Sequence, residues 1–285
     1  MPRRKSKKAG ERTAAQSLQE YGRGIAGGLM LSLPLLYTME VWWAGFSAHP
    51  WRLLAYMLAT FVLLLGYNRY GGLRRDASMM EVAIDSVEEM GIGIVISAVA
   101  LFLLGRITFE MPFNEMAGQI VVEAMTVAIG VSIGTAQLGG DDEDEGLAGD
   151  TGEQQIHFGG QMLLALCGAV LFASNVAPTE EIVMIAVEIS WGRLLVLALV
   201  SMLVGSLILH FSEFKGARQF VRTESFSAIL IGTVLTYAVA LVASALILWF
   251  FGRFDGVTLY TALAQIIVLG VAASFGASAG RLLLQ

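Results

Sequence analysis

The chain has 285 residues, of which 56% are hydrophobic and 15% are charged, and its formal net charge is -6. Apolar runs of about twenty residues recur from residue 25 onward, as in helical proteins that cross a membrane several times, so a soluble domain is excluded. The negative charge lies in a loop and within apolar runs, so it indicates no nucleic-acid partner. A single cysteine, Cys167, excludes an internal disulfide framework and a cysteine-rich metal site.

The chain begins with a polar, basic segment, residues 1–24, followed by the first long apolar run. That run, residues 25–46, is too long for the apolar region of a signal peptide, so we expect a retained first helix. The basic segment is typical of a cytoplasmic orientation signal, and binding to anionic lipid is the alternative.

Eight apolar runs are long enough to cross a bilayer. They cover residues 25–46, 51–67, 79–104, 113–138, 159–175, 182–210, 226–251 and 257–281. Within the sixth run, residues 182–190 form either a bend or a separate external helix. Eight spans place both termini on one side, and then only Arg52, Arg106, Arg193 and Arg253 of the 18 Lys and Arg residues fall on the other side. This asymmetry predicts that both termini are cytoplasmic.

The two halves of the chain match each other. Residues 119–134 align without gaps with residues 265–280, with six identities in sixteen positions. The other matches, in the same order, are Ser97, Ala98, Gly105 and Arg106 with Ser244, Ala245, Gly252 and Arg253; Arg52 to Leu54 with Arg193 to Leu195; and Thr38 and Glu40 with Thr179 and Glu181. Four blocks at offsets of 141 to 147 residues predict an internal duplication of four helices. Because four is even, both copies have the same orientation in the membrane.

The sequence therefore predicts an all-α integral membrane protein with about eight transmembrane helices, arranged as two parallel four-helix repeats with cytoplasmic N- and C-termini. Its expected segments are a basic cytoplasmic tail (1–24), a first repeat (25–138), an acidic cytoplasmic linker (139–157) and a second repeat (158–285). The linker is rich in Asp and Glu, but no register supplies all the ligands of an EF-hand. A solvated linker is favoured, and a calcium-sensitive loop is the alternative.

The third apolar run begins with an acidic face. Its members are Glu81, Asp85, Glu88 and Glu89, which share one broad side of a helix. They match Ala228, Gly232, Leu235 and Thr236 in the uncharged run 226–251. Because that run plainly spans, we expect the acids to lie within the inner half of the bilayer. The competing interpretation starts the membrane at Met90 and leaves about fifteen apolar residues, which is short for a span.

Glu123 lies near the middle of the fourth run, where the second half has Leu269. A charged side chain at the bilayer centre costs roughly 2.5 to 3.5 kcal/mol, so it is expected to face the bundle interior or a wet cavity. With the acids of the third run, Glu123 could form one cation or proton path from the cytoplasmic side. The alternative is that these acids pair internally or line a vestibule without transport.

Glu40 and Glu181 occupy equivalent positions near the outer side of the two halves. Two such carboxylates could form a cation-selective ring at an outer mouth. Salt bridges with Arg52 and Arg193, which also recur, are the alternative. Pro178 breaks the chain just before Glu181, and such breaks can expose carbonyl groups to cations.

The fourth and eighth runs each contain a G-x-x-x-G pair, and such pairs let helices approach closely in lipid. The glycines are Gly130, Gly134, Gly276 and Gly280. We expect these two helices to pack against each other. The same segments match G-x-S-x-G, but no histidine is placed to activate a serine, so neither an enzyme nor a cofactor is expected.

Three segments carry a family resemblance: Thr38-Met-Glu-Val-Trp-Trp43, Ser86-Val-Glu-Glu-Met-Gly91 and Ala177-Pro-Thr-Glu-Glu181. In these the chain resembles a family of bacterial multi-pass integral membrane proteins of unknown function. The resemblance covers the first helix to the C-terminus. It implies a bacterial cytoplasmic (inner) membrane and brings no catalytic residues.

The first hypothesis for function is a cation channel or a cation/proton-coupled transporter whose path follows the intramembrane carboxylates. A non-transporting scaffold or sensor, acting through the basic tail and the acidic linker, is the alternative. The expected partners are the lipid bilayer and a small cation or proton, and a homo-oligomer is possible.

Overall fold

The computed structural model describes residues 14–72, 77–138, 158–211 and 226–283, and all regular structure in these ranges is α-helical. In chain order the helices are α1 (Ala14–Leu36), α2 (Met39–Ser47), α3 (Pro50–Tyr70), α4 (Met79–Leu103), α5 (Phe113–Gln137), α6 (Phe158–Val176), α7 (Glu180–Glu188), α8 (Trp191–Phe211), α10 (Phe226–Phe250) and α11 (Leu259–Leu283). The expectation of an all-α chain is confirmed.

Seven of these helices are long and apolar enough to cross a membrane, and the number is eight if the bent pair α1 and α2 forms one span. On α8, apolar side chains such as Leu195, Leu199 and Leu203 are more than half exposed. Exposed leucines in a row suit a helix whose solvent is lipid. The chain is therefore a multi-pass integral membrane protein.

The predicted first span, residues 25–46, is wrong as a single helix. The axis turns by 87° between α1 and α2. Pro34 has no N–H to donate, and the chain turns shortly after it, where the Thr38 amide and hydroxyl donate to the carbonyls of Leu35 and Pro34. α1 also begins at Ala14, so residues 14–24, expected in the tail, are helical.

The predicted sixth span, residues 182–210, is divided as well. Of the two expectations for residues 182–190, the separate helix holds: α7 ends at Glu188 and α8 begins at Trp191. The backbone of Ile189 is extended, which interrupts the helical hydrogen bonds between α7 and α8.

The helix bounds recur along the chain at the offsets of the sequence matches. Moving α2 and α3 by 141 residues gives the bounds of α7 and α8, moving α4 by 147 gives α10, and moving α5 by 146 gives α11. The turns after α4 and α10 each contain a glycine with positive φ, Gly105 at 67° and Gly252 at 70°. The duplication stays a prediction from the sequence, and these coincident bounds support it.

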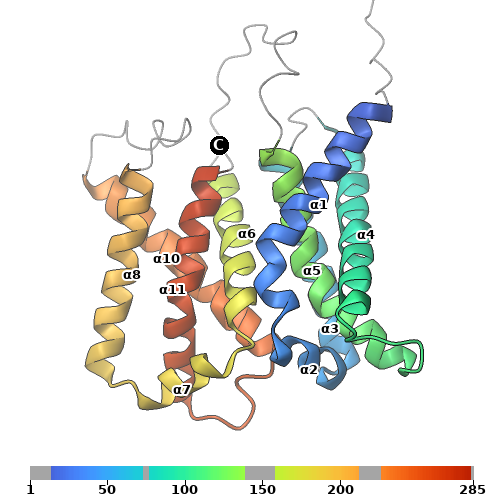
Figure 1. Ribbon diagram of the computed structural model, residues 1–285. Coiled ribbons are helices and arrows are strands. Elements are labelled where there is room, and N and C mark those ends of the chain that lie inside the picture. The colour runs from blue at the N-terminus through green and yellow to red at the C-terminus, as the bar shows by residue number, and fades with distance from the viewer. Residues whose placement is uncertain (1–13, 73–76, 139–157, 212–225, 284–285) are drawn as a thin grey trace, which may run out of the picture.

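Each half is built around its last helix. α5 packs against α1, α2, α3 and α4, and α11 packs against α6, α7, α8 and α10 (Figure 1). α6 also contacts α1, α3 and α5, which joins the halves. The start of α1 and the end of α11 lie at one edge, which we call the terminal face, while α2 and α7 lie at the opposite face (Figure 1). That the terminal face is cytoplasmic stays a prediction.

The glycine pairs do not join α5 to α11. A Cβ on Gly134 of α5 would lie 2.6 Å from the Cα atom of Gly27 on α1, and a Cβ on Gly276 of α11 would lie 2.2 Å from the carbonyl oxygen of Gly168 on α6. Gly130 and Gly280 make the same kinds of contact. The close approach is therefore within each half, because α1 and α6 supply the small residues that face these pairs.

Candidate functional site

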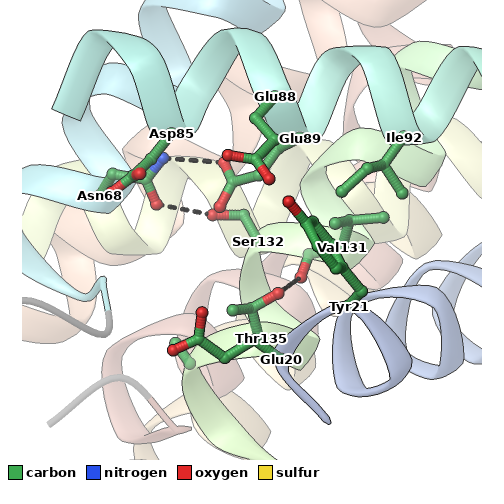
Figure 2. A pocket seen from close by; sticks show the side chains of 11 residues that line it. Glu20, Tyr21, Asn68, Asp85, Glu88, Glu89, Ile92, Val131, Ser132 and Thr135 are labelled. Carbon is green, nitrogen blue, oxygen red and sulfur yellow. Dashed lines mark hydrogen bonds between the residues drawn. The ribbon is translucent and has the colours of Figure 1, made fainter. Parts of the chain in front are cut away.

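An acidic pocket of about 70 Å³ lies near the terminal face, between α1, α3, α4 and α5 (Figure 2). Four carboxylates line it: Glu20 of α1 and Asp85, Glu88 and Glu89 of α4. Glu88 is exposed, Asp85 and Glu20 are half-buried and Glu89 is buried. The pocket therefore extends from the surface of the helix bundle toward its interior.

Glu81 has a different role from the other acids of the third run. Its carboxylate accepts a 2.7 Å hydrogen bond from the Ser78 amide, and the Ser78 hydroxyl accepts one from the Glu81 amide. This reciprocal capping box binds two of the amide groups left unpaired at the start of α4. Glu81 is exposed and is not among the pocket residues, so only three of the four predicted acids of α4 line the pocket.

Glu89 is held in the pocket wall by a network from three helices. The Asn68 amide of α3 donates to the Glu89 carboxylate at 2.8 Å and to the Ser86 hydroxyl at 3.1 Å. The Ser132 hydroxyl of α5 donates to the Asn68 carbonyl oxygen at 2.9 Å, which points the amide nitrogen toward Glu89 (Figure 2). A buried polar group is costly without hydrogen-bond partners, so this network offsets part of the free energy of burying Glu89.

Sequence reasoning missed several residues that line the pocket. Glu20 and Tyr21 lie on the first turns of α1, in the segment expected to be a tail, and Asn68, Ser132 and Thr135 are single polar residues on other helices. Leu18 and Tyr21, spaced by three residues, were a weak signal that the helix begins before residue 25. No pattern in the sequence indicates that these residues lie next to α4.

Glu123 does not line the pocket. It lies on α5, fully buried, and neither carboxylate oxygen has a hydrogen-bond partner within the part of the chain that the structure describes. Nine residues separate it from Ser132, which corresponds to roughly 13 Å along a helix. The structure therefore places Glu123 deeper in the membrane than the acids of α4, rather than among them.

Other polar groups accompany Glu123 along α5. Gln119 and Thr126 lie at helical spacing from it on the same face, and both are buried. Thr126 shares a 3.0 Å hydrogen bond with the hydroxyl of Tyr56 on α3. The interior of the first half thus contains a row of polar side chains in its membrane-embedded part.

Glu40 and Glu181 lie on the first turns of α2 and α7, at the opposite face, where Glu40 is half-buried and Glu181 is exposed. The arginine expected to pair with Glu40 binds elsewhere, because Arg52 forms a 3.2 Å ion pair with Asp255. Glu180, the carboxylate next to Glu181, forms an ion pair with Arg253.

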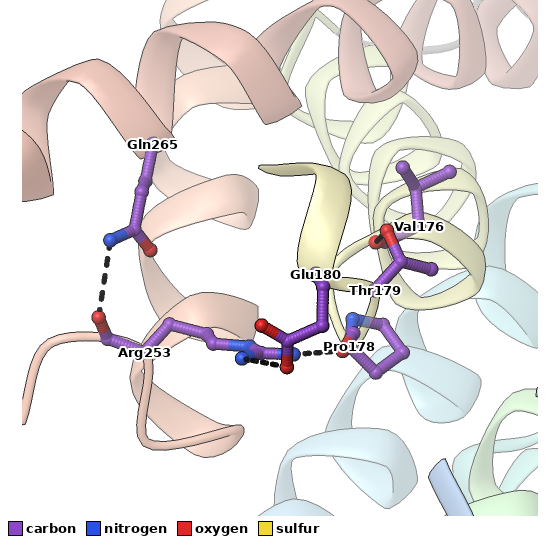
Figure 3. A network of polar contacts seen from close by, with 6 residues as sticks. All are labelled: Val176, Pro178, Thr179, Glu180, Arg253 and Gln265. Atoms are coloured by element: carbon purple, nitrogen blue, oxygen red, sulfur yellow. Dashed lines mark hydrogen bonds and ion pairs between the residues drawn. The ribbon is translucent and has the colours of Figure 1, made fainter. Parts of the chain in front are cut away.

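An arginine side chain binds the backbone at the break before α7, so this break is not left open to cations. Arg253 forms a 3.2 Å ion pair with Glu180 and donates to the carbonyl oxygen of Pro178 (Figure 3). Its own carbonyl oxygen accepts a hydrogen bond from Gln265 of α11 at 3.3 Å. The carbonyl at Pro178, one of those that such a break could expose to a cation, therefore accepts a hydrogen bond from Arg253 in the loop after α10.

In the described ranges, no group of three or more His, Cys, Asp or Glu side chains is arranged to hold a metal ion. The acidic linker 139–157, with its possible calcium site, and the first part of the basic tail lie outside the described residues.

Comparison with known families gives the chain its classification. Residues 20–284 match the family described as "Putative integral membrane protein (DUF2391)". The chain belongs to this family. The match confirms the resemblance seen in the sequence and includes every residue that lines the acidic pocket. No curated protein and no solved structure matches the chain.

Proposed function

We propose that this family member is a proton-coupled cation transporter in which the acidic pocket binds the cation and Glu123 carries a proton deeper in the membrane. The observation that carries the proposal is Glu89, a carboxylate buried in the wall of a pocket and oriented by Asn68. Ionisable residues inside a membrane are costly, and they recur in proton relays and ion paths.

The first step is attraction of a cation to the pocket. Four carboxylates surround a small volume between apolar helices, and such a cleft focuses a negative potential and raises the local concentration of cations. Glu88 lies at the exposed end and Glu89 at the buried end, so a cation enters past Glu88 and meets Glu89 inside.

The burial of Glu123 favours a transporter over an open channel. Glu123 is fully buried, and it does not line the acidic pocket. An unpaired buried carboxylate is costly in its charged form, so Glu123 is suited to hold a proton until a conformational change gives it access. Glu40 and Glu181 at the opposite face are suited to receive cations there.

The test is transport by the full chain in liposomes. A cation gradient is imposed, and an enclosed pH-sensitive dye reports proton movement in the wild type and in E89Q, E123Q and E188Q. Glu188 is an exposed acid at the end of α7, outside the pocket, and serves as the matched control. We expect E89Q and E123Q to lose at least nine-tenths of the proton flux and E188Q to keep it.

Wild-type flux in both E89Q and E123Q would contradict the proposed path. If the wild type itself moved no protons or cations, the proposal would fail as a whole. The scaffold or sensor alternative predicts that result, together with loss of partner binding when residues 139–155 are deleted.

A further inference from the structure

The two halves of the chain meet along a junction that uses a different face of each half. Near the opposite face, Arg52 of α3 forms a 3.2 Å ion pair with Asp255, which follows α10. The ring of Tyr56 on α3 stacks on that of Phe250 at the end of α10, with the ring centroids 4.2 Å apart. The first half thus gives α3 to this part of the junction, and the second half gives α10.

Closer to the terminal face, α3 contacts α6. The Cys167 thiol of α6 donates to the carbonyl oxygen of Leu63 at 3.7 Å. About one turn further along each helix, a Cβ on Gly66 would overlap the side chain of Leu163, so this leucine fits against a glycine. A small residue that admits a neighbouring helix is the kind of contact that joins helices in lipid.

The same pair of faces is present a second time on the outside of the molecule. At the repeat offsets, α8 corresponds to α3, α1 to α6 and α4 to α10. Gly27 and Gly168, 141 residues apart, make matching contacts with α5 and α11, which supports the register of α1 on α6. In Figure 1, α8 lies at one end of the molecule and α4 at the other. The face of α8 therefore does not meet the faces of α1 and α4 within one chain.

Positions that are buried in the junction have exposed counterparts on these faces. Cys167 of α6 is 1% exposed, whereas its counterpart on α1, Ala26, is exposed. Phe250 of α10 is 4% exposed, and its counterpart on α4, Leu103, is 78% exposed. The first half thus presents to its surroundings the face with which the second half packs against α3.

The exposed faces are complementary in shape. Leu207 of α8, which corresponds to Gly66, is 43% exposed. Gly22 of α1 corresponds to Leu163, and a Cβ added to it would have no atom within 4 Å, so there is open space at this position. The leucine and the glycine have exchanged helices between the two pairs of faces, and a leucine still stands opposite a glycine.

The exposed faces are also complementary in charge. Arg193 at the start of α8 corresponds to Arg52 and is exposed. The turn after α4, which corresponds to the turn that contains Asp255, has the exposed Glu110. A cation on α8 and an anion after α4 therefore lie at the ends of the two faces where Arg52 and Asp255 pair in the junction.

We propose that a second copy of this chain docks on these faces, so that α8 of each copy packs against α1 and α4 of the other. Leu207 of one copy then fits against Gly22 of the other, and Arg193 pairs with Glu110. An interface between two different faces is head-to-tail, and it closes when the last copy meets the first. Two copies close it as a ring of four halves joined by junctions of one kind.

Lipid is the other candidate to cover these faces. Lipid tails are as apolar as leucine, so exposed leucines alone do not indicate a protein partner. The leucines that suit lipid include Leu195 and Leu199, which by helical spacing lie on a different side of α8 from Arg193, Leu197 and Leu207. The match in size and charge distinguishes the proposed face from that side.

The first test is disulfide cross-linking of the full chain in its membrane. G22C/L207C is made in a C167A background, oxidised and separated on a non-reducing denaturing gel. We expect a product with twice the mass of one chain, which reduction returns to single chains, because residues 22 and 207 meet across the interface. Single chains alone would overturn the proposal.

G22C/I231C is the matched control. Ile231 on α10 is exposed and lies about as far from the terminal face as Leu207, but it is not on a proposed face. We expect no product from this pair, nor from G22C or L207C alone, because the two faces that meet are different. Equal yields from the control and from G22C/L207C would show random collision and would also overturn the proposal.

A second test needs no cysteine. Light scattering of the wild type in detergent should give the mass of two copies. R193E places a glutamate against Glu110 at both interfaces, so the apparent Kd of the dimer should rise at least tenfold, and E110R in the same chain should restore it. A monomeric wild type, an R193E protein as dimeric as the wild type, or a double variant as weak as R193E would overturn the proposal. Neither test measures transport, so the dimer and the proposed function are decided separately.

Discussion

The Asn68 amide donates a 2.8 Å hydrogen bond to the Glu89 carboxylate, and this contact joins α3 to α4 inside the acidic pocket. Both residues are buried. The Asn68 amide on one helix therefore supports the burial of the Glu89 carboxyl group on the next. The stability of the first half and its proposed chemistry therefore depend on the same pair.

The pair predicts a specific pattern in a double-mutant cycle. N68L leaves Glu89 buried without this donor, and an unsatisfied buried polar group lowers the free energy of unfolding by about 1 to 3 kcal/mol. N68L combined with E89L removes both partners of this bond, so we expect a smaller loss of stability than the sum of the two single variants, although the Ser132 hydroxyl also loses its acceptor on Asn68. Denaturant unfolding in detergent measures both. Additive losses in the double variant would contradict the coupling.

Substitutions of Glu81 and of Glu89 are expected to have different effects on proton flux. E81Q alters the capping box at the start of α4 and leaves the pocket lining unchanged, so its proton flux in liposomes should match the wild type. S78A should lower the free energy of unfolding by about 1 kcal/mol, as for other lost N-caps, again without loss of flux. Flux lost in E81Q would place Glu81 in the path after all.

Replacing Glu123 by leucine is expected to raise the stability of the protein and to abolish proton flux. The second half has Leu269 at the matching position, and E123L removes two carboxylate oxygens that have no partner in the described residues. Replacing an unpaired buried polar group by a well-packed leucine should raise the free energy of unfolding by roughly 1 to 3 kcal/mol. Proton flux should fall to background. A less stable E123L protein would indicate that Glu123 has a binding partner.

The contact between α6 and α11 predicts a steric effect. A Cβ at Gly168 would lie 2.1 Å from the carbonyl oxygen of Gly276, so G168A must push the helices apart and should lower stability by about 1 to 3 kcal/mol. Gly159, on the same helix, has no atom within 4 Å of an added Cβ, so G159A is the matched control. It should be neutral or slightly stabilising, because alanine favours helices over glycine. Equal losses in the two variants, measured by thermal unfolding, would contradict the close packing.

Much of the fold could be predicted because the bilayer imposes simple rules. A long apolar run must form a helix to satisfy its backbone, so the spans of α3, α4, α5, α10 and α11 follow from hydrophobicity and length. The break between α1 and α2 could not be predicted in the same way. The apolar run continues across the bend, and Pro34, which marks it, more often only kinks a helix.

The site was harder to predict than the helices. The acids of α4 are visible because they follow each other at helical spacing, but Glu20, Asn68 and Thr135 are isolated in the sequence and meet the acids only through packing. The sequence suggests one path for Glu123 and these acids because all of them lie in apolar runs that are predicted to span the membrane. Depth along α5 separates it from the pocket, because it lies nine residues before Ser132 on the same helix.

The acidic pocket is proposed as the entry point of a transported cation, and cation-driven proton flux in liposomes tests this for E89Q beside E188Q. Both substitutions replace one carboxyl group by an amide. We expect E89Q to lose at least nine-tenths of the flux while E188Q retains it. Equal flux in the two variants would contradict it.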